Sequence, residues 1–498
     1  MAHARLETLR EDFAKIIDIH SVLSLMHWDL EVFMPPKAAS ARGQQLATMS
    51  GIAHRMLTDA SIGEALAELK AESLSGDDAL TVREIDHDYA LATKLPESYV
   101  ITFAEKQNLA YQAWIEAREN SDFGLFQPHL ATLVDLLRQK ADFLGYEGTP
   151  YNALLSEYER GMTAEQIKPI FTDLADRQSV LIEKIMGSSD QPNVEWTDQL
   201  WDEGAQWDFT LEVLRDMGYD FDAGRQDKSI HPFTTNFDVN DVRITTRVHE
   251  RELFSALTGS IHEGGHALYE QGFLPGDQRT ILGQAASLGI HESQSRMWEN
   301  MIGRSLPFWK HYESSIKDRY PGQLEKVSAN DLYRAINEVK PSLIRVEADE
   351  CTYNLHIILR FEIELALIEG DLKVGDLPEI WNEKMKDYLG LDVPSDAEGC
   401  LQDIHWSHGS MGYFPTYALG NLYAAQLFEK IEADLPQLWA DVEAGNFQGL
   451  LNWLRKHVHE VGRRKLASEI VEDASGSAPT AEPYMRYLES KYGDLYKL

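Results

Sequence analysis

Residues 262–266 read His-Glu-Gly-Gly-His, and this short stretch says more about fold and chemistry than any other part of the chain. Because an α-helix advances about 100° per residue, residues four apart lie on one face. His262 and His266 can therefore direct two imidazoles at one metal ion, with Glu263 beside them. A bound metal lowers the pKa of a water molecule to about 7, and a neighbouring carboxylate can take its proton as it attacks a carbonyl. The stretch predicts a helix that carries a zinc-type hydrolytic site.

The flanking residues predict that this helix is buried rather than an exposed polar face. Apolar residues recur at helical spacing along it, namely Leu253, Leu257, Ile261 and Leu268. A glycine inside a helix costs about 1 kcal/mol relative to alanine. Gly264 and Gly265 therefore indicate the close approach of another backbone or of a substrate. Gly272 is expected to end the helix.

A catalytic zinc site needs a third protein ligand and one open position. The extended pattern H-E-x-x-H-x-x-G-x-x-H is excluded, because Tyr269 and Gly272 stand at its glycine and last histidine. Further along, Glu292 begins a segment with apolar residues at helical intervals, and its neighbour His291 competes for the role. We favour Glu292, although the residues alone leave open an ordinary glutamate in the first turn of a helix.

Helical periodicity dominates the rest of the chain. Strand patterns are few: residues 233–237 and 242–246 alternate around a turn at 238–241, and 281–288 is expected to add a third short strand. The fold class is therefore mainly α, with a small antiparallel β-sheet beside the site, whose edge can bind an extended peptide. No Pro/Gly/Ser-rich linker divides the sequence, so residues 1–498 are expected to form a single domain, with helices in about 1–120 as a lid over a groove.

Composition excludes several classes of function. The chain has 81 acidic and 46 basic residues and a formal net charge of −35, which opposes binding to nucleic acid or to an anionic membrane. Two cysteines cannot build a disulfide framework, and no apolar run is long enough to span a bilayer. The N-terminus lacks the apolar core of a signal peptide, so we expect a cytoplasmic protein.

Several motifs together make the chain resemble the carboxypeptidase Taq family of metallocarboxypeptidases. In order, they are His231-Pro232-Phe233, Asp241-x-Arg243-x-Thr245, His262-Glu263-x-x-His266, His291-Glu292-Ser293-Gln294, Ile344-Arg345-x-x-Ala348-Asp349 and Gly399-x-x-Gln402-Asp403-x-His405-Trp406. The family-like segments His27-Trp28-Asp29 and Gly412-Tyr413-Phe414-Pro415 extend the resemblance over nearly the whole sequence.

The resemblance implies properties that spacing alone does not show. The metal ligands become His262, His266 and Glu292, and Glu263 becomes the general base and later the proton donor. The fold becomes a large two-lobed helical peptidase similar to neurolysin and angiotensin-converting enzyme, with a long groove. The resemblance implies an enzyme that removes single residues from the C-terminus of peptides. Its specificity for the removed residue is expected to be broad, with poor cleavage before proline. Such enzymes use zinc or cobalt and usually form homodimers.

Candidate substrate residues follow from what a carboxypeptidase must bind. A terminal carboxylate suits the bidentate fork of an arginine. Arg345 is our candidate, against a structural ion pair with Glu347 or Asp349. Arg243 is the second choice, with Asp241 as its expected salt partner. Gln402 and His231 are expected to line the groove.

The tetrahedral oxyanion needs hydrogen-bond donors. His405 and Tyr417 are the candidates, with Tyr413 as the alternative to Tyr417. Asp349 and Glu299 are both candidates to orient a ligand histidine. Two other functions remain open at this point: a peptidase with the same metal site that cuts internally or releases dipeptides, and a peptide-binding protein without activity.

Overall fold

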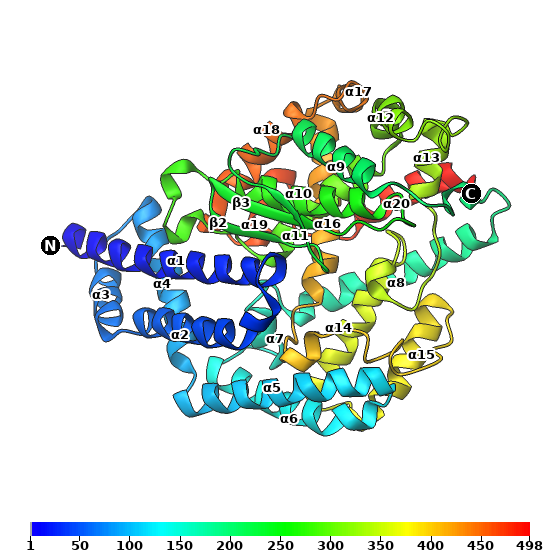
Figure 1. Ribbon diagram of the computed structural model, residues 1–498. Helices are drawn as coiled ribbons and strands as arrows, with labels where there is room; N and C mark the ends of the chain where they lie inside the picture. Colours follow the sequence, from blue (N-terminus) through cyan, green and yellow to red (C-terminus); the bar gives the residue numbers. More distant parts are fainter. Residues whose placement is uncertain (1) are drawn as a thin grey trace.

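The computed structural model describes residues 2–498 and is built mainly from helices around a three-stranded sheet (Figure 1). The first half of the chain contributes α1 (Ala2–Val32), α2 (Ala39–Leu57), α3 (Ala60–Lys70), α4 (Gly76–Lys94), α5 (Glu97–Asn120), α6 (Phe123–Leu144), α7 (Tyr151–Leu155), α8 (Ala164–Gly187) and α9 (Glu203–Met217). The strands are β1 (Gln226–Lys228), β2 (Thr234–Asp238) and β3 (Asp241–Thr246). The mainly helical fold is thus confirmed.

The second half of the chain holds the remaining helices. They are α10 (Ser255–Glu270), α11 (Leu288–Arg296), a π-helix (Met297–Gly303), α12 (Leu306–Arg319), α13 (Ala329–Ile336), α14 (Tyr353–Glu369), α15 (Leu377–Leu389), α16 (Pro415–Asp434), α17 (Leu438–Glu443), α18 (Gln448–His457), α19 (Ala467–Ser475) and α20 (Glu482–Tyr496). Short 3-10 turns at Arg345–Glu347 and His405–His408 carry two of the predicted site residues. Across the described residues, no helix combines the length and apolar character needed to cross a bilayer.

The sheet is mixed rather than purely antiparallel. Strands β2 and β3 pair antiparallel as expected, with Thr235 opposite Arg243, and β1 pairs parallel to the other edge of β3. The expected strand at 281–288 was wrong: Ile281–Gly283 forms a 3-10 turn, and Ser287 caps α11. The segment Gln-Asp-Lys of β1 has little intrinsic strand propensity, so pairing with β3 decides its conformation.

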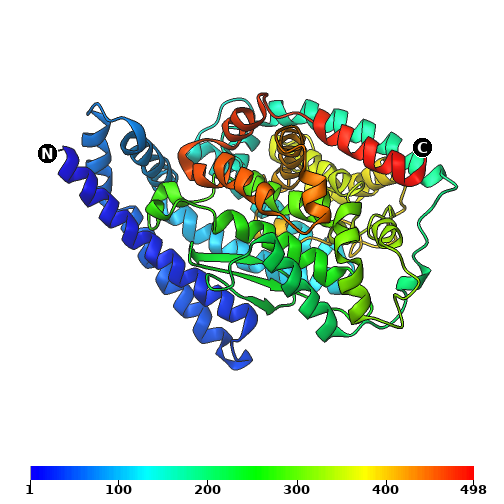
Figure 2. The same cartoon turned by 90° about the horizontal axis from the view of Figure 1, so that it is seen from above.

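Helices α1 to α4 pack on a small hydrophobic core of their own. Its buried members are Leu6, Leu9, Phe13, Ile16, Ile62, Ala65, Leu66, Leu69, Val82 and Ile85, joined by Ile281 and Leu282. These helices project from one side of the molecule, and α1 runs along β2 (Figures 1 and 2). Helix α5, by contrast, contributes Trp114 to the main core. A lid movement of the N-terminal helices stays a prediction.

A close approach between α10 and α11 depends on Gly265. A Cβ added there would lie 2.7 Å from the Cα of Ser295 and 2.8 Å from the carbonyl oxygen of Gln294. This agrees with the close backbone contact expected for the glycine pair. Helix α10 ends at Glu270, so Gly272 is not the residue that ends it; a Cβ at Gly272 would instead overlap the ring of His459.

Gly265→Ala is expected to destabilise the fold by about 1–3 kcal/mol, because the added methyl meets backbone atoms that cannot rotate away. The control is Gly493→Ala in α20, where a Cβ meets no atom within 4 Å. The control should gain up to about 1 kcal/mol from helix propensity alone. Urea unfolding of the metal-free proteins measures both changes. A Gly265→Ala variant as stable as the control would contradict the packing argument.

Candidate metal centre

Two elements bring three candidate ligand side chains to one point. Helix α10 presents His262 and His266 one turn apart, and α11 presents Glu292. Glu292 Oε2 lies 3.7 Å from His262 Nε2 and 3.5 Å from His266 Nε2. Ligand atoms about 2.0–2.2 Å from a tetrahedral zinc are separated from one another by about 3.4 Å. The donor set and its spacing therefore fit a divalent metal with one position left open.

The outer ring nitrogens of both histidines are already engaged. His262 Nδ1 donates to Glu299 Oε2 at 2.9 Å, and His266 Nδ1 donates to the carbonyl oxygen of His291 at 3.0 Å. A carbonyl oxygen only accepts, so the Nε2 lone pair of His266 faces the other ligands. Glu299, on the π-helix, is thus the carboxylate that contacts His262, whereas Asp349 accepts from the backbone of Lys340.

Glu292 is held in place by its neighbours. Arg296, one turn further along, donates from Nε to Glu292 Oε1 at 2.7 Å, which leaves Oε2 for the histidines. Burial acts to raise the pKa of Glu292, but Arg296 and His262 hold it well below its usual range. A Cβ added at Gly420 of α16 would meet Glu292 Cβ and Cγ at 2.6 Å, so glycine makes room for this ligand. Sequence reasoning missed Arg296, although its i+4 spacing from Glu292 was a usable signal.

His291 has a role in this region other than metal ligation. Its Nε2 lies 2.7 Å from Glu270 Oε1, and Glu270 in turn contacts Asn236 of β2. Its Nδ1 is next to His266 Nδ1, on the side of the His266 ring away from Glu292. The geometry therefore favours Glu292 over His291 as the third ligand.

Glu263 lies beside the three ligands without joining them. Thr234 Oγ1 of β2 donates to Glu263 Oε2 at 2.7 Å, so the sheet fixes the carboxylate. Burial raises the pKa of Glu263 above its ordinary value, although His262 and Thr234 counteract that effect. A carboxylate with a raised pKa is better matched to accepting and returning a proton near neutral pH. Thr234 was not recognised from the sequence.

Arg345 is buried and has an ionic partner that the sequence did not suggest. Its Nε and Nη2 lie 3.0 and 2.9 Å from Asp403 Oδ1, and Nη1 donates to the hydroxyl of Tyr353 at 3.1 Å. Asp403 also binds the buried Arg360. Glu347 and Asp349 are thus not its partners. A guanidinium has five N–H donors, and within the described residues these contacts leave two N–H groups of Arg345 without an acceptor.

The three aromatic candidates for oxyanion binding lie together near Arg345. Tyr417 Oη is 3.5 Å from His405 Nε2, and the rings of Tyr413 and Tyr417 meet edge to face at 5.3 Å. The Arg345 guanidinium lies 5.2 Å from the centre of the Tyr417 ring. Burial lowers the pKa of His405 to about 4, despite Asp403 nearby, so its ring is neutral at pH 7.

The other candidates lie in positions less suited to direct contact with substrate. Gln402 accepts from the backbone N–H of Arg345 at 2.9 Å and donates to three backbone carbonyls. Arg243 forms a bidentate pair with Asp241 at 2.7 and 2.8 Å, and it also covers Trp28 of α1. His231 is exposed in the loop before β2.

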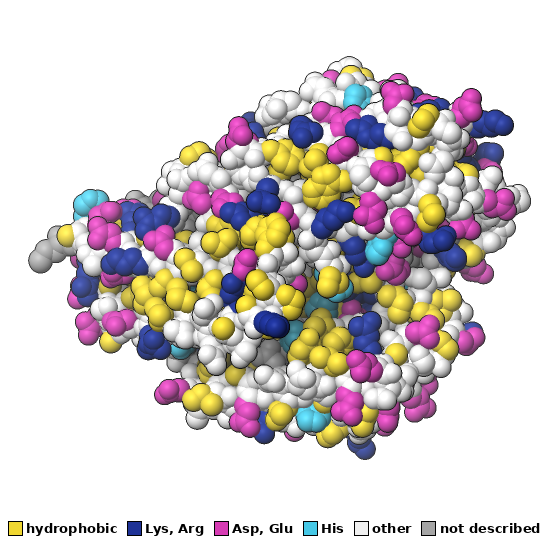
Figure 3. Space-filling model, in the orientation of Figure 1, with side chains coloured by type: hydrophobic (Ala, Val, Ile, Leu, Met, Phe, Trp, Pro, Cys, Tyr) yellow, Lys and Arg dark blue, Asp and Glu magenta, His cyan; other side chains and the backbone are white. Residues whose placement is uncertain are grey.

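The molecular surface is hollowed between the part that carries the sheet and the part that carries α5 and α6 (Figure 3). Histidine side chains are visible inside this hollow. A helical fold with two histidines and a distant glutamate around one metal position, and a second glutamate beside them, defines a metallopeptidase.

Comparison with known proteins identifies the family. The pattern of carboxypeptidase Taq (M32) metallopeptidases matches residues 8–492. The chain is 42% identical to thermostable carboxypeptidase 1 of Thermus thermophilus over 489 residues, 96% of each chain, and 40% identical to carboxypeptidase 1 of Bacillus subtilis, 98% of each. The crystal structure of the M32 carboxypeptidase from Deinococcus radiodurans superposes with a TM-score of 0.97 at 40% identity, covering 99% of this chain and all of that one. The chain belongs to the carboxypeptidase Taq (M32) family and is a metallocarboxypeptidase.

Proposed function

We propose that this metallocarboxypeptidase releases single residues from the free C-terminus of peptides, with broad specificity for the residue removed. The observation that carries the proposal is the position of Glu263, a buried carboxylate that follows His262 on α10, stays outside the three-residue donor set and is held by Thr234. His262, His266 and Glu292 would hold the metal. We propose Zn²⁺, with Co²⁺ as the alternative, because two imidazoles and one carboxylate suit both ions.

When bound, a divalent metal at this centre supplies a Lewis acid for the scissile carbonyl and lowers the pKa of a water molecule. Glu263 accepts a proton from the attacking water on its carboxylate oxygen and returns it to the leaving amine nitrogen. Thr234 keeps that carboxylate in one orientation during both transfers. Glu299 and the carbonyl of His291 keep the ligand rings from rotating.

The position of the substrate is proposed from Arg345 and the polar side chains that lie next to it. Arg345 is proposed to bind the terminal carboxylate with the N–H groups left free by Asp403 and Tyr353. Tyr417, or its neighbour Tyr413, and His405 are proposed to donate to the oxyanion, because their polar atoms gather beside Arg345. Gln402 supports Arg345 through the backbone. We also propose that His231 and Arg243 contact the substrate directly.

We propose that the protein works in the cytoplasm as a homodimer. Cys351 and Cys400 are both buried and unpaired, which suits a reducing cytoplasm. A homodimer is proposed from the family resemblance and is measured directly by sedimentation equilibrium. The strongly acidic composition opposes nucleic acid and anionic membranes as partners.

Amidated peptides separate this activity from internal cleavage. With metal removed and then restored by zinc or cobalt, the enzyme should release amino acids from free peptides. Blocking the C-terminus as an amide should lower kcat/KM at least roughly 100-fold, because charge-assisted hydrogen bonds of about 1.5–3 kcal/mol each are lost. Amino-acid analysis of both peptides measures the ratio. Equal cleavage of the amidated peptide would instead indicate an endopeptidase, and release of dipeptides would indicate a peptidase that removes two residues at a time.

A further inference from the structure

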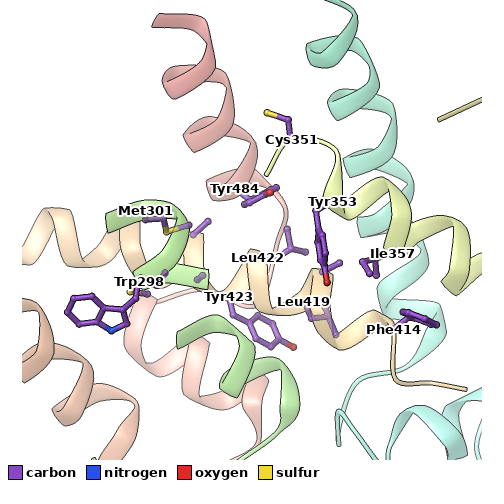
Figure 4. Close-up of a cluster of buried hydrophobic side chains, with 14 of the residues drawn as sticks. Trp298, Met301, Cys351, Tyr353, Ile357, Phe414, Leu419, Leu422, Tyr423 and Tyr484 are labelled. Carbon is purple, nitrogen blue, oxygen red and sulfur yellow. The ribbon is translucent and has the colours of Figure 1, made fainter. Parts of the chain in front are cut away.

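Tyr353 lies between Arg345 and Arg296, and the function proposed above uses it only as an acceptor for one N–H group of Arg345. It is the first residue of α14 and is 6% exposed. Figure 4 shows its ring standing between α14 and α16, with the hydroxyl at the end nearer Leu419. The side chain has only two rotatable bonds and is buried in the main hydrophobic core, so it has little freedom to move.

The hydroxyl of Tyr353 contacts the arginine proposed to bind substrate. It accepts from Arg345 Nη1 at 3.1 Å, while Asp403 binds the Nε and Nη2 side of the same guanidinium. Arg345 is thereby held from two directions, so its plane cannot turn without breaking one contact. The N–H groups that remain free are therefore presented in a fixed direction.

The ring of Tyr353 contacts the arginine that holds a metal ligand. The Arg296 guanidinium carbon lies 4.4 Å from the ring centre, within the range of a cation–π contact. Arg296 Nε donates to Glu292 Oε1 at 2.7 Å. One side chain thus joins Arg345 at its hydroxyl end to Glu292 through Arg296 at its face.

We propose that Tyr353 is a positioning residue that sets the separation between the carboxylate-binding arginine and the metal centre. The distance between these two ends decides how many residues fit between a free C-terminus and the bond that is cleaved, so Tyr353 fixes release at one residue. The inference rests on the proposed role of Arg345.

Tyr353→Phe removes the hydroxyl and keeps the ring. For a peptide with a free C-terminus, KM should rise roughly tenfold with kcat within about twofold, because a hydrogen bond that orients Arg345 is lost. A fraction of the product should also appear as C-terminal dipeptide. The matched control is Tyr320→Phe, which loses a partly buried hydroxyl contact of 3.0 Å to the carbonyl of Asp202, outside the site. The control should leave KM and products unchanged.

Tyr353→Leu removes the ring as well and tests the metal end. Its affinity for zinc, measured by chelator competition without substrate, should fall roughly 10-fold or more, as for loss of a group that supports a ligand. Tyr353→Phe should keep the affinity of the wild type. Thermal unfolding of each variant is measured in parallel. This distinguishes a loss of zinc affinity in a folded protein from a loss of folding.

A double-mutant cycle with Arg345→Lys tests whether Tyr353 acts through Arg345. The KM of the double variant should not exceed that of Arg345→Lys alone, because the shared contact is already lost. If Tyr353→Phe keeps the KM and single-residue products of the wild type, or lowers kcat alone, the inference is overturned while the proposed function stands. If the wild type cleaves free and amidated peptides equally, the proposed function fails and the inference fails with it.

Discussion

Replacing Glu263 with glutamine is expected to lower kcat by roughly 10²–10⁴-fold, the usual contribution of a positioned general acid–base group. Glutamine has nearly the same shape and can still accept from Thr234, which donates to Glu263 Oε2 at 2.7 Å. It cannot take a proton from water at neutral pH. The substitution therefore separates proton transfer from folding and packing. Stopped assays of amino-acid release with saturating peptide measure the effect.

Metal affinity is the control for Glu263→Gln. Glu263 is not among the three residues whose donor atoms gather at the metal position. Chelator competition should therefore give the wild-type affinity, and KM should change little, because the lost interaction belongs to the transition state. A variant that kept wild-type kcat would remove Glu263 from the mechanism. A variant that lost metal as well would show that glutamine disturbs the ligands.

Replacing Glu292 with glutamine should remove activity by removing the metal. The amide is a poorer ligand than the carboxylate, and it removes the closer of the two carboxylates that pair with the partly buried Arg296, at 2.7 Å, which leaves only Glu299 at 3.3 Å. Loss of a group that hydrogen-bonds to a metal ligand lowers metal affinity by roughly 10–100-fold. Because Glu292 is itself a proposed ligand, we expect the affinity for zinc to fall by more than this. Titration against a competing chelator measures this directly, and raised zinc concentration should restore part of the activity.

Glu299→Gln provides the graded comparison for Glu292→Gln. Glu299 accepts from His262 Nδ1 at 2.9 Å and does not belong to the donor set. An amide oxygen can still accept that bond, although the ion pairs with Arg296 and Arg304 are lost. The affinity for zinc should fall by about 10–100-fold. Equal losses in the two variants would contradict the distinction between a ligand and the group that orients one.

The metal helix could be predicted from the sequence because its signal is local. His262 and His266 are one turn apart, so a helix alone brings them to one side. The glycine pair likewise predicted a close backbone approach, and Gly265 meets Ser295 of α11. The mainly helical class followed from apolar spacing along the chain. The strand β1 could not be predicted in this way, because its three polar residues become a strand only when they pair with β3.

The metal helix, its two histidines and the glutamate beside them could all be recognised without a structure, and the sequence motifs resembled those of one family. The choice of partners was decided only by the tertiary structure. Glu299 rather than Asp349 binds His262, Asp403 rather than Glu347 binds Arg345, and Tyr353 comes to lie between Arg345 and Arg296. The physical reason is distance along the chain: these contacts join separate elements, and buried charges pair with whichever opposite group the packing of those elements brings within reach.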